Sequence, residues 1–161
     1  MRSLFGFAFS VLAFVSMTAC SSLPTVKHKT YEFPKNRAFI GVPKSLPRYE
    51  KKGLAKARAS FATLEPEGDV DWLCNNYFNK AVAQLIERAK EHGGDGVIDV
   101  RSVTFLMDGK IETYSRAECV DDGESGDVYV QGVVVKFKCD DEKNHLTTTE
   151  KEQCKKMGIE K

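Results

Sequence analysis

The stretch FNKAVAQLIERAKEHGGDGVIDVRSVTF, residues 78–105, decides the fold of this chain. Its first part places apolar residues on one face of a helix with 3.6 residues per turn. These residues are Phe78, Val82, Leu85, Ile86 and Ala89. The pair Gly93-Gly94 supplies the left-handed conformation that often ends a helix, and the β-rich run after it is typical of a strand. The sequence therefore predicts a helix followed directly by a strand.

Three more strands are predicted around this unit. Between Ala55 and Phe61, small apolar residues alternate with polar ones, which indicates a strand with one buried face. Asp108-Gly109 lies between two β-rich runs and is a strong signal for a hairpin turn. Residues 127–138, DVYVQGVVVKFK, form the last strand. The predicted fold class is α+β, in the order strand-helix-strand-strand-strand, with one helix packed on a mainly antiparallel sheet.

The N-terminus has the three-part layout of a secretory signal. Arg2 precedes an apolar run from Leu4 to Val15, and small and polar residues follow. A membrane-spanning helix needs roughly 20 apolar residues, and this run is shorter. We therefore expect residues 1–19 to be a cleaved signal peptide.

The segment Met17-Thr18-Ala19-Cys20 resembles the lipobox of bacterial lipoproteins. The resemblance implies cleavage before Cys20, diacylglycerol on its thiol and a further acyl chain, such as palmitate, on its amine. Met17 stands where the family usually has Leu. The alternative is an ordinary secreted protein cut nearby, but Met17 is large for an A-x-A-like site. Two or three acyl chains anchor a protein far more firmly than one.

Three further parts of the chain follow the signal peptide. Residues 20–36 lack apolar periodicity and are predicted to be a flexible spacer between membrane and domain. Residues 37–139 form the α+β domain, which opens with a short strand over Ala38–Val42. Residues 140–161 form a polar tail with a short helix, because Thr149-Glu150-Lys151-Glu152 fits a capping box and Gly158 marks a stop.

Four cysteines remain besides the one expected to be lipidated. They are Cys74, Cys119, Cys139 and Cys154. An even number in an exported chain predicts two disulfides, with three possible connectivities. Metal binding is the alternative, since Cys139, His145 and Cys154 offer three ligands. Structural zinc sites favour tight C-x₂₋₄-C pairs, which the sequence lacks, so we expect no metal ligand.

Other chemistries find little support. The acidic run at residues 121–127 offers hard oxygen ligands for Ca²⁺, but it lacks the spacing of an EF-hand loop and is typical of a solvated turn. No G-x-S-x-G motif occurs, and His28, His92 and His145 are scattered, so we expect no catalytic residue and no cofactor. The 24 basic and 23 acidic residues are balanced, which argues against nucleic-acid binding.

The segment EHGGDGVIDVRSV, the hairpin after it and the AEC…GVVVKF strand resemble a pattern found in small bacterial proteins of the YbjQ-like family, which are described as heavy-metal-binding. More distantly they resemble RcsF-like outer-membrane lipoproteins that sense envelope stress. The match covers roughly Tyr49–Lys138. It rests on the final strand and on Gly93, Gly94, Asp95, Gly96, Val97, Ile98, Val100 and Arg101. It implies one helix on an antiparallel sheet.

The resemblance also bears on the cysteines. RcsF-like proteins have a Cys before the helix and another entering the last strand region, which resemble Cys74 and Cys119. The other two cysteines of this chain lie beyond the matched region. We expect Cys74 to pair with Cys119, which would tie the helix to the end of the second hairpin strand. Cys139 would then pair with Cys154 and hold the terminal helix.

These observations favour a non-catalytic, membrane-anchored envelope lipoprotein that binds or senses another envelope component, with an envelope protein as its partner. Ser21 after the lipidated Cys predicts the outer membrane, facing the periplasm, in a Gram-negative host. The alternative is a YbjQ-like periplasmic metal- or ligand-binding protein. An envelope enzyme is the third class. Trp72, Tyr77 and Phe78 are expected to close one end of the core; an exposed aromatic patch for a partner is the alternative.

Overall fold

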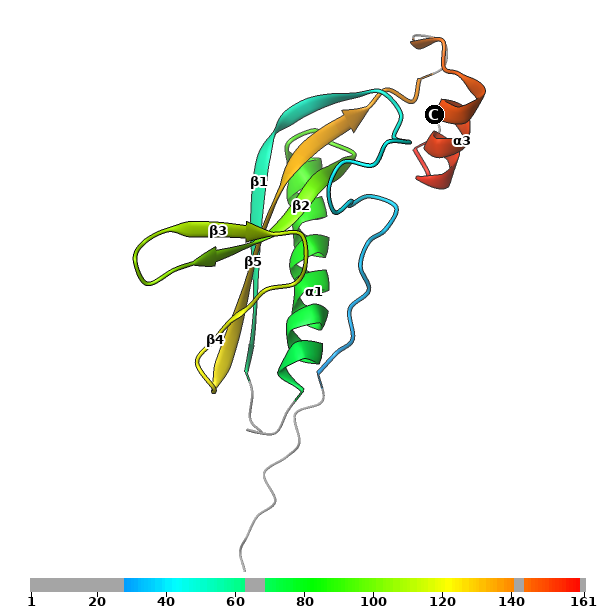
Figure 1. Ribbon diagram of the computed structural model, residues 1–161. Coiled ribbons are helices and arrows are strands. Elements are labelled where there is room, and N and C mark those ends of the chain that lie inside the picture. Colours follow the sequence, from blue (N-terminus) through cyan, green and yellow to red (C-terminus); the bar gives the residue numbers. More distant parts are fainter. Residues whose placement is uncertain (1–27, 63–68, 141–143, 160–161) are drawn as a thin grey trace, which may run out of the picture.

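The computed structural model describes residues 28–62, 69–140 and 144–159. One long helix lies against one face of an antiparallel sheet, as Figure 1 shows. The elements are β1 (Tyr49–Ala62), α1 (Val70–Glu91), β2 (Gly96–Phe105), β3 (Ile111–Tyr114), β4 (Val120–Asp121), β5 (Ser125–Phe137) and α3 (Thr148–Lys156). The strand order is β1-β5-β2-β3, and β4 pairs with β5. The predicted α+β class and element order are confirmed, with β4 as an addition.

The core lies between α1 and the sheet. The apolar stripe of α1 is buried, and Val82 and Leu85 are fully covered. Burial of one such side chain stabilises the fold by roughly 1.5–3 kcal/mol. The alternating small residues of β1, from Ala55 to Phe61, face the helix and are also buried, as their period-2 pattern predicts.

The ends of α1 are set by local chemistry. The carboxylate of Asp69 accepts a hydrogen bond from the Trp72 backbone N–H and caps the first turn. At the other end Gly93 has a φ of +70°, a backbone conformation that residues other than glycine rarely adopt. The helix begins several residues before its apolar stripe because the Asp69 cap, and not the first buried residue, defines its start.

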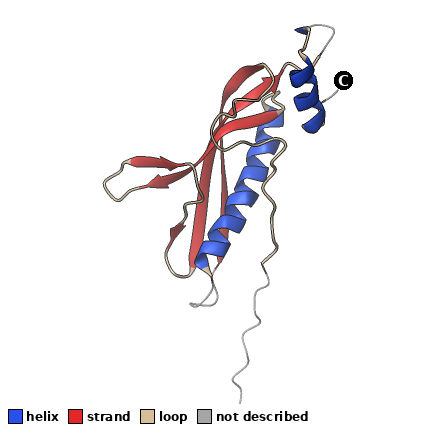
Figure 2. Ribbon diagram, turned by 45° about the vertical axis from the view of Figure 1, so that its right-hand side comes forward, coloured by secondary structure: helices blue, strands red, loops and turns tan. Residues whose placement is uncertain are grey.

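A second, smaller core lies at the far end of the sheet, where α3 packs. Met157 is buried against Ile98, Val135 and Phe137. Figure 2 shows α3 beyond the end of the sheet, away from the start of α1. The C-terminal helix is therefore held by apolar contacts as well as by its disulfide.

Three local predictions need correction. The capping box of α3 lies two residues earlier than expected, because Thr147 and Glu150 exchange the bonds. Segment 38–42 forms one parallel bridge, Ala38 with Val97, in place of a strand. The second hairpin strand ends at Tyr114 and not at Cys119, since the chain leaves the sheet there.

Candidate functional site

Both disulfides are present in the structure. Cys74 is joined to Cys119, and Cys139 to Cys154, each with a Cα–Cα distance of 5.8 Å. These are the two pairs that the sequence analysis predicts. Disulfides persist in oxidising compartments, so the domain belongs outside the cytoplasm. Because all four sulfurs are bonded, Cys139 and Cys154 offer no thiolate to a metal beside His145.

In the acidic loop at residues 121–125, the carboxylates accept hydrogen bonds from backbone N–H groups of the same loop. Asp122 accepts hydrogen bonds from the N–H groups of Ser125 at 2.7 Å and Glu124 at 3.0 Å, which lower the pKa of the carboxyl group. Asp121 accepts one from the Gly123 N–H at 2.6 Å. Within the described ranges, no three His, Cys, Asp or Glu side chains gather as a metal would require.

The three histidines lie in separate places. His28 begins the described chain, His92 is the C-cap of α1, and His145 precedes α3. Of these, His28 has a recorded side-chain partner, with its Nδ1 3.3 Å from the Tyr77 hydroxyl oxygen. In the part of the chain that the structure describes, no helix is long and apolar enough to cross a bilayer.

The hairpin tip, residues 105–111 between β2 and β3, projects from the body of the molecule (Figure 1). It exposes three consecutive large apolar side chains and a fourth, Ile111, which pairs with Phe105 across the hairpin. They are Phe105 (55%), Leu106 (38%), Met107 (108%) and Ile111 (61%). Single exposed apolar residues are ordinary, but a contiguous group marks an interaction surface. The turn itself is regular, because Asp108 accepts a hydrogen bond from the Lys110 N–H at 3.0 Å.

The base of the hairpin is fixed to the sheet face that α1 leaves open. The Phe105 ring meets the Tyr129 ring edge-on at 5.3 Å, and the Arg58 guanidinium lies 5.2 Å from the same Tyr129 ring. Arg58 also bonds Asp127 twice, at 3.0 and 2.6 Å. Burial acts to raise the pKa of Asp127, but hydrogen bonds from Ser60 and Arg58 outweigh it and lower that pKa. The ring contact of Phe105 with Tyr129 therefore joins the base of the hairpin to β5.

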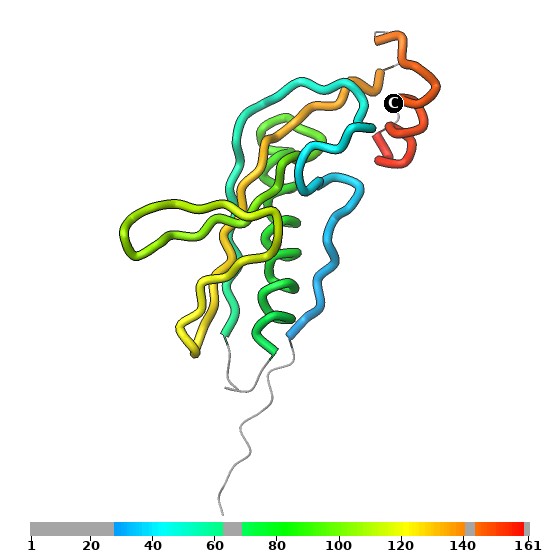
Figure 3. Tube along the Cα trace, viewed as in Figure 1, coloured from blue at the N-terminus to red at the C-terminus, as the bar shows by residue number. Residues whose placement is uncertain are grey.

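A second feature is the strap, residues 28–41, which runs beside α1 in Figure 3. The Asn76 side chain holds it by two main-chain bonds: the Tyr31 N–H donates to Oδ1 at 2.6 Å, and Nδ2 donates to the Lys29 carbonyl at 2.7 Å. Asn79 donates to the Tyr31 carbonyl at 3.0 Å. Residues 28–36 were expected to be flexible spacer, and their structure differs because asparagines of α1 bind their backbone.

Aromatic contacts accompany these bonds. The Phe33 ring stacks on Phe78 at 6.2 Å, and the Tyr31 ring meets Tyr77 edge-on at 5.9 Å. Tyr77 and Phe78 are buried, as expected, whereas Trp72 is 41% exposed. The His28 ring lies 6.5 Å from Trp72. The strap therefore covers the aromatic residues at the start of α1 and leaves Trp72 at its margin.

The second half of the strap pairs with β2. The Phe39 N–H donates to the Val97 carbonyl at 3.0 Å, and the Val97 N–H donates to the Arg37 carbonyl at 2.8 Å. The Asp99 N–H donates to the Gly41 carbonyl at 2.7 Å. The start of β2 therefore forms backbone hydrogen bonds with residues 37–41, which run parallel to it but do not form a regular strand.

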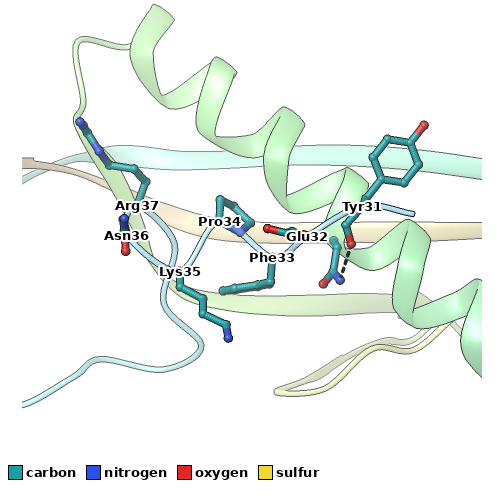
Figure 4. A pocket seen from close by; sticks show the side chains of 8 residues that line it. Tyr31, Glu32, Phe33, Pro34, Lys35, Asn36 and Arg37 are labelled. Atoms are coloured by element: carbon teal, nitrogen blue, oxygen red, sulfur yellow. Dashed lines mark hydrogen bonds between the residues drawn. The ribbon is translucent and has the colours of Figure 1, made fainter. Parts of the chain in front are cut away.

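An open depression of about 840 Å³ lies beside the strap. Its walls are residues 31–37 and Asn79. Figure 4 shows the side chains of Lys35 and Arg37 on different sides of the strap and the bond from Asn79 to Tyr31. Arg37 is engaged, since it donates to the carbonyls of Asp95 at 3.0 Å and Gly158 at 3.2 Å. The strap does not fill the space next to α1.

The strap contacts were not predicted. The available signal was Asn76, which lies among apolar residues on the buried side of α1 and is itself 4% exposed. A polar side chain in that position needs a partner, but the sequence does not show that the partner is a main chain 45 residues away.

Comparison with known proteins gives one structural similarity. No protein-family model matches the chain, and no curated protein matches it. The crystal structure of a protein of unknown function from Pediococcus pentosaceus, a member of the DUF74 or YbjQ-like family, is similar with a TM-score of 0.44 and 16% identity. The alignment covers 63% of this chain and 96% of the other. It assigns no function to this chain.

Proposed function

We propose that this protein is a non-catalytic, lipid-anchored module of the cell envelope that binds another envelope protein through its hairpin tip. The observation that carries the proposal is the group of four exposed apolar side chains at residues 105–111. Interfaces place such residues at their centre and surround them with polar groups. The ion pair of Asp108 with Lys110, 2.6 Å apart, supplies a polar margin here.

The surroundings of the hairpin tip support this role. Tyr129 packs against Phe105 at the base of the hairpin, and Arg58 packs against Tyr129. These contacts reduce the freedom that the hairpin would lose on binding. Aromatic and arginine side chains at that base are the types enriched in binding hot spots. β3 is an edge strand of the sheet, which also offers main-chain groups to a partner.

The binding surface is tested by site-specific photocrosslinking in living cells. A photoreactive residue at Met107 or Ile111 is expected to capture one discrete partner. Ala83, an exposed position in the middle of α1, is the matched control and should capture none. Equal labelling from all three positions would contradict the proposal, because it would show that the hairpin tip has no preferred partner.

The anchor is tested separately. Mass spectrometry of the mature protein is expected to find diacylglycerol and an acyl chain on Cys20, and Cys20→Ala should leave an uncleaved or soluble form. On a sucrose gradient the protein should sediment with outer-membrane markers. An unmodified start at another residue would refute the anchor, and sedimentation with inner-membrane markers would refute the outer-membrane location.

A second candidate function is binding of a metal or small ligand, as the resemblance to YbjQ-like proteins implies. The depression beside the strap favours it, since Glu32, Lys35 and Asn79 offer polar groups there. Calorimetry of the oxidised protein with Zn²⁺ distinguishes the two functions. Stoichiometric binding that Glu32→Ala removes would support this candidate over the protein-binding module.

A further inference from the structure

The sulfur atoms of the described residues differ sharply in their access to solvent. All four described cysteines are bonded in disulfides, so none of them presents a thiol to an oxidant. Of the two described methionines, Met157 is 6% exposed and packs in the smaller core against Ile98, Val135 and Phe137. Met107 has an exposed fraction of 108%, which means that almost none of its surface is covered. Within the described ranges, Met107 is therefore the thioether that an oxidant in solution reaches directly.

The turn at the end of the hairpin explains why Met107 stays uncovered. The Gly109 N–H donates to the Leu106 carbonyl at 2.9 Å, and the Leu106 N–H donates to the Lys110 carbonyl at 2.8 Å. Gly109 has a φ of +81°, the left-handed conformation that three-residue hairpin loops use at this position. Met107 is thus the first central residue of a turn that its own backbone bonds close. Its exposure follows from the geometry of the turn.

Met107 also lies within the hairpin tip that we propose binds an envelope protein. Phe105, Leu106 and Ile111 are exposed beside it, and Phe105 pairs with Ile111 across the hairpin. An unbranched thioether adapts well to an apolar partner surface. A sulfoxide in the same position adds a hydrogen-bond acceptor, which is unfavourable to bury without a donor. Addition of one oxygen atom would therefore make the hairpin tip polar at its most exposed apolar side chain.

We propose that Met107 is an oxidant-sensitive modification site, and that its reversible conversion to methionine sulfoxide prevents the hairpin tip from binding its partner. This inference rests on the protein-binding function proposed above and adds its regulation. The two disulfides support it, because they indicate an oxidising compartment. The modification acts on the unbound protein, in which the sulfur is open to solvent.

The oxidant is a two-electron oxidant such as hypochlorous acid. The sulfur lone pair attacks the chlorine atom, the Cl–O bond breaks and hydroxide leaves. Water then adds to the sulfur and chloride departs, so that an S–O bond replaces the S–Cl bond. Sulfur loses two electrons, chlorine leaves as chloride, and one proton in balance passes to the solvent. Methionine sulfoxide reductases reverse the change by returning the two electrons.

Peptide mass spectrometry tests the modification site without reference to a partner. The full mature protein in detergent is treated with hypochlorous acid, and Met107 is expected to gain one oxygen about tenfold faster than the buried Met157, or faster still. The two methionine sulfoxide reductases, one for each sulfoxide epimer, should then remove that oxygen from the folded protein. Equal oxidation rates at the two methionines would overturn the proposal, as would a sulfoxide at Met107 that the reductases leave in place.

Photocrosslinking from Ile111 in living cells tests the effect on binding. Hypochlorous acid added before illumination is expected to lower capture of the partner about fivefold or more. Met107→Gln, which places a polar side chain of similar length at the tip, should lower capture without oxidant. Met107→Leu has no sulfur at this position, so its capture should be the same with and without oxidant. Met157→Leu is the matched control, and its capture should still fall on oxidation because Met107 remains.

The outcomes separate this proposal from the protein-binding function itself. If oxidant lowers capture in the Met107→Leu protein as much as in the unaltered protein, the oxidant acts elsewhere and the regulatory role of Met107 is wrong. If Ile111 captures no partner in untreated cells, the protein-binding function is refuted and its regulation with it. Mass spectrometry then decides the modification site independently.

Discussion

Glu150 carries a pH dependence that belongs to a single residue. Hydrogen bonds from the Thr147 backbone N–H, the Arg48 guanidinium and the Thr147 hydroxyl lower the pKa of its carboxyl group from the ordinary 4.5 to about 2. The Thr147 N–H lies 2.9 Å from one oxygen and Arg48 Nε lies 2.8 Å from the other. The charged carboxylate thus links the start of α3 to the segment before β1.

Because the pKa of Glu150 is lower in the folded protein, its stabilising effect is complete above pH 4.5 and is lost as the pH falls towards 2. Chemical shifts of the α3 amides, followed between pH 6 and pH 2, are expected to move with a midpoint near 2. Glu150→Gln should remove this transition, and Arg48→Ala should move it upwards. A midpoint near 4.5 in the unaltered protein would contradict the assignment.

Gly96 marks the closest approach of the strap to the sheet. A Cβ atom there would lie 2.7 Å from the Arg37 carbonyl oxygen and 3.0 Å from the Phe137 ring. Gly96→Ala should push residue 37 away from β2 and lower the free energy of unfolding by about 1–3 kcal/mol, the usual effect of overpacking. Hydrogen exchange at the Phe39 N–H should rise relative to the rest of the sheet.

Gly126→Ala is the control for this experiment. A Cβ atom at Gly126 would lie 2.1 Å from the Phe61 ring, so the substitution strains the core away from the strap. The free energy of unfolding should fall to a similar extent, while the hydrogen-exchange rate of the Phe39 N–H relative to the amides of β5 should stay unchanged. If both variants raise the exchange rate of the Phe39 N–H equally, the close approach of the Arg37 carbonyl to Gly96 does not determine how the strap is held.

At the scale of elements, the two disulfides join different parts of the fold. The bridge from Cys74 to Cys119 spans 45 residues and joins α1 to the loop before β4. In the chain-entropy model a loop of this length contributes about 4 kcal/mol to folding. The bridge from Cys139 to Cys154 spans 15 residues and joins the end of β5 to α3.

Replacing both cysteines of one pair by Ala measures how much each disulfide contributes to stability. Loss of Cys74 and Cys119 is expected to lower the free energy of unfolding of the whole domain by about 4 kcal/mol in denaturant titrations. Loss of Cys139 and Cys154 should free α3 and leave the main transition nearly unchanged, because Met157 at the end of α3 belongs to the smaller core around Phe137 and not to the main core. The reverse order of effects would show that α3 supports the main core.

Most regular elements were predictable because each has a periodic signal of its own. From Phe78 to Ala89 the apolar residues recur with the period of a helix, and from Ala55 to Phe61 they recur with the period of a strand. In both cases the period arises because one face of the element is buried. The cysteine pairs followed from the placement of those elements. The strap has no such signal, since it is held by two asparagines that bind its backbone. The hairpin turn was predicted, but its exposure arises because β2 continues to Phe105 beyond its last pair with β5, Ser102 with Val130. The sequence pattern does not define that point.

At the scale of the whole molecule, the strap decides where the chain leaves the domain. His28 lies beside Trp72 and Tyr77 near the start of α1, and α3 lies at the opposite end of the molecule (Figure 1). With Cys20 as the proposed anchor, about eight residues separate the lipid from His28, and these reach at most about 28 Å. The start of α1 then faces the membrane, and the far end lies roughly 33 Å farther away, the length of a 22-residue helix.

Release of the strap changes this distance. If residues 28–33 are released, the chain between Cys20 and Pro34 is free to extend while residues 37–41 stay paired with β2. About 14 residues then reach at most about 50 Å. Docking of the strap therefore sets how far the domain, with its hairpin tip, extends from the bilayer.

The single tryptophan of the chain, Trp72, reports this distance directly. In proteoliposomes with a dansyl-labelled lipid, energy transfer from Trp72 is expected to be efficient in the unaltered protein, because the docked strap keeps the start of α1 near the bilayer. Tyr31→Ala with Phe33→Ala should reduce the transfer by releasing the tether. Glu32→Ala with Lys35→Ala is the matched control: both side chains are exposed on the same segment, so the transfer should stay at the level of the unaltered protein. Equal transfer in all three proteins would show that the strap does not determine the height of the domain.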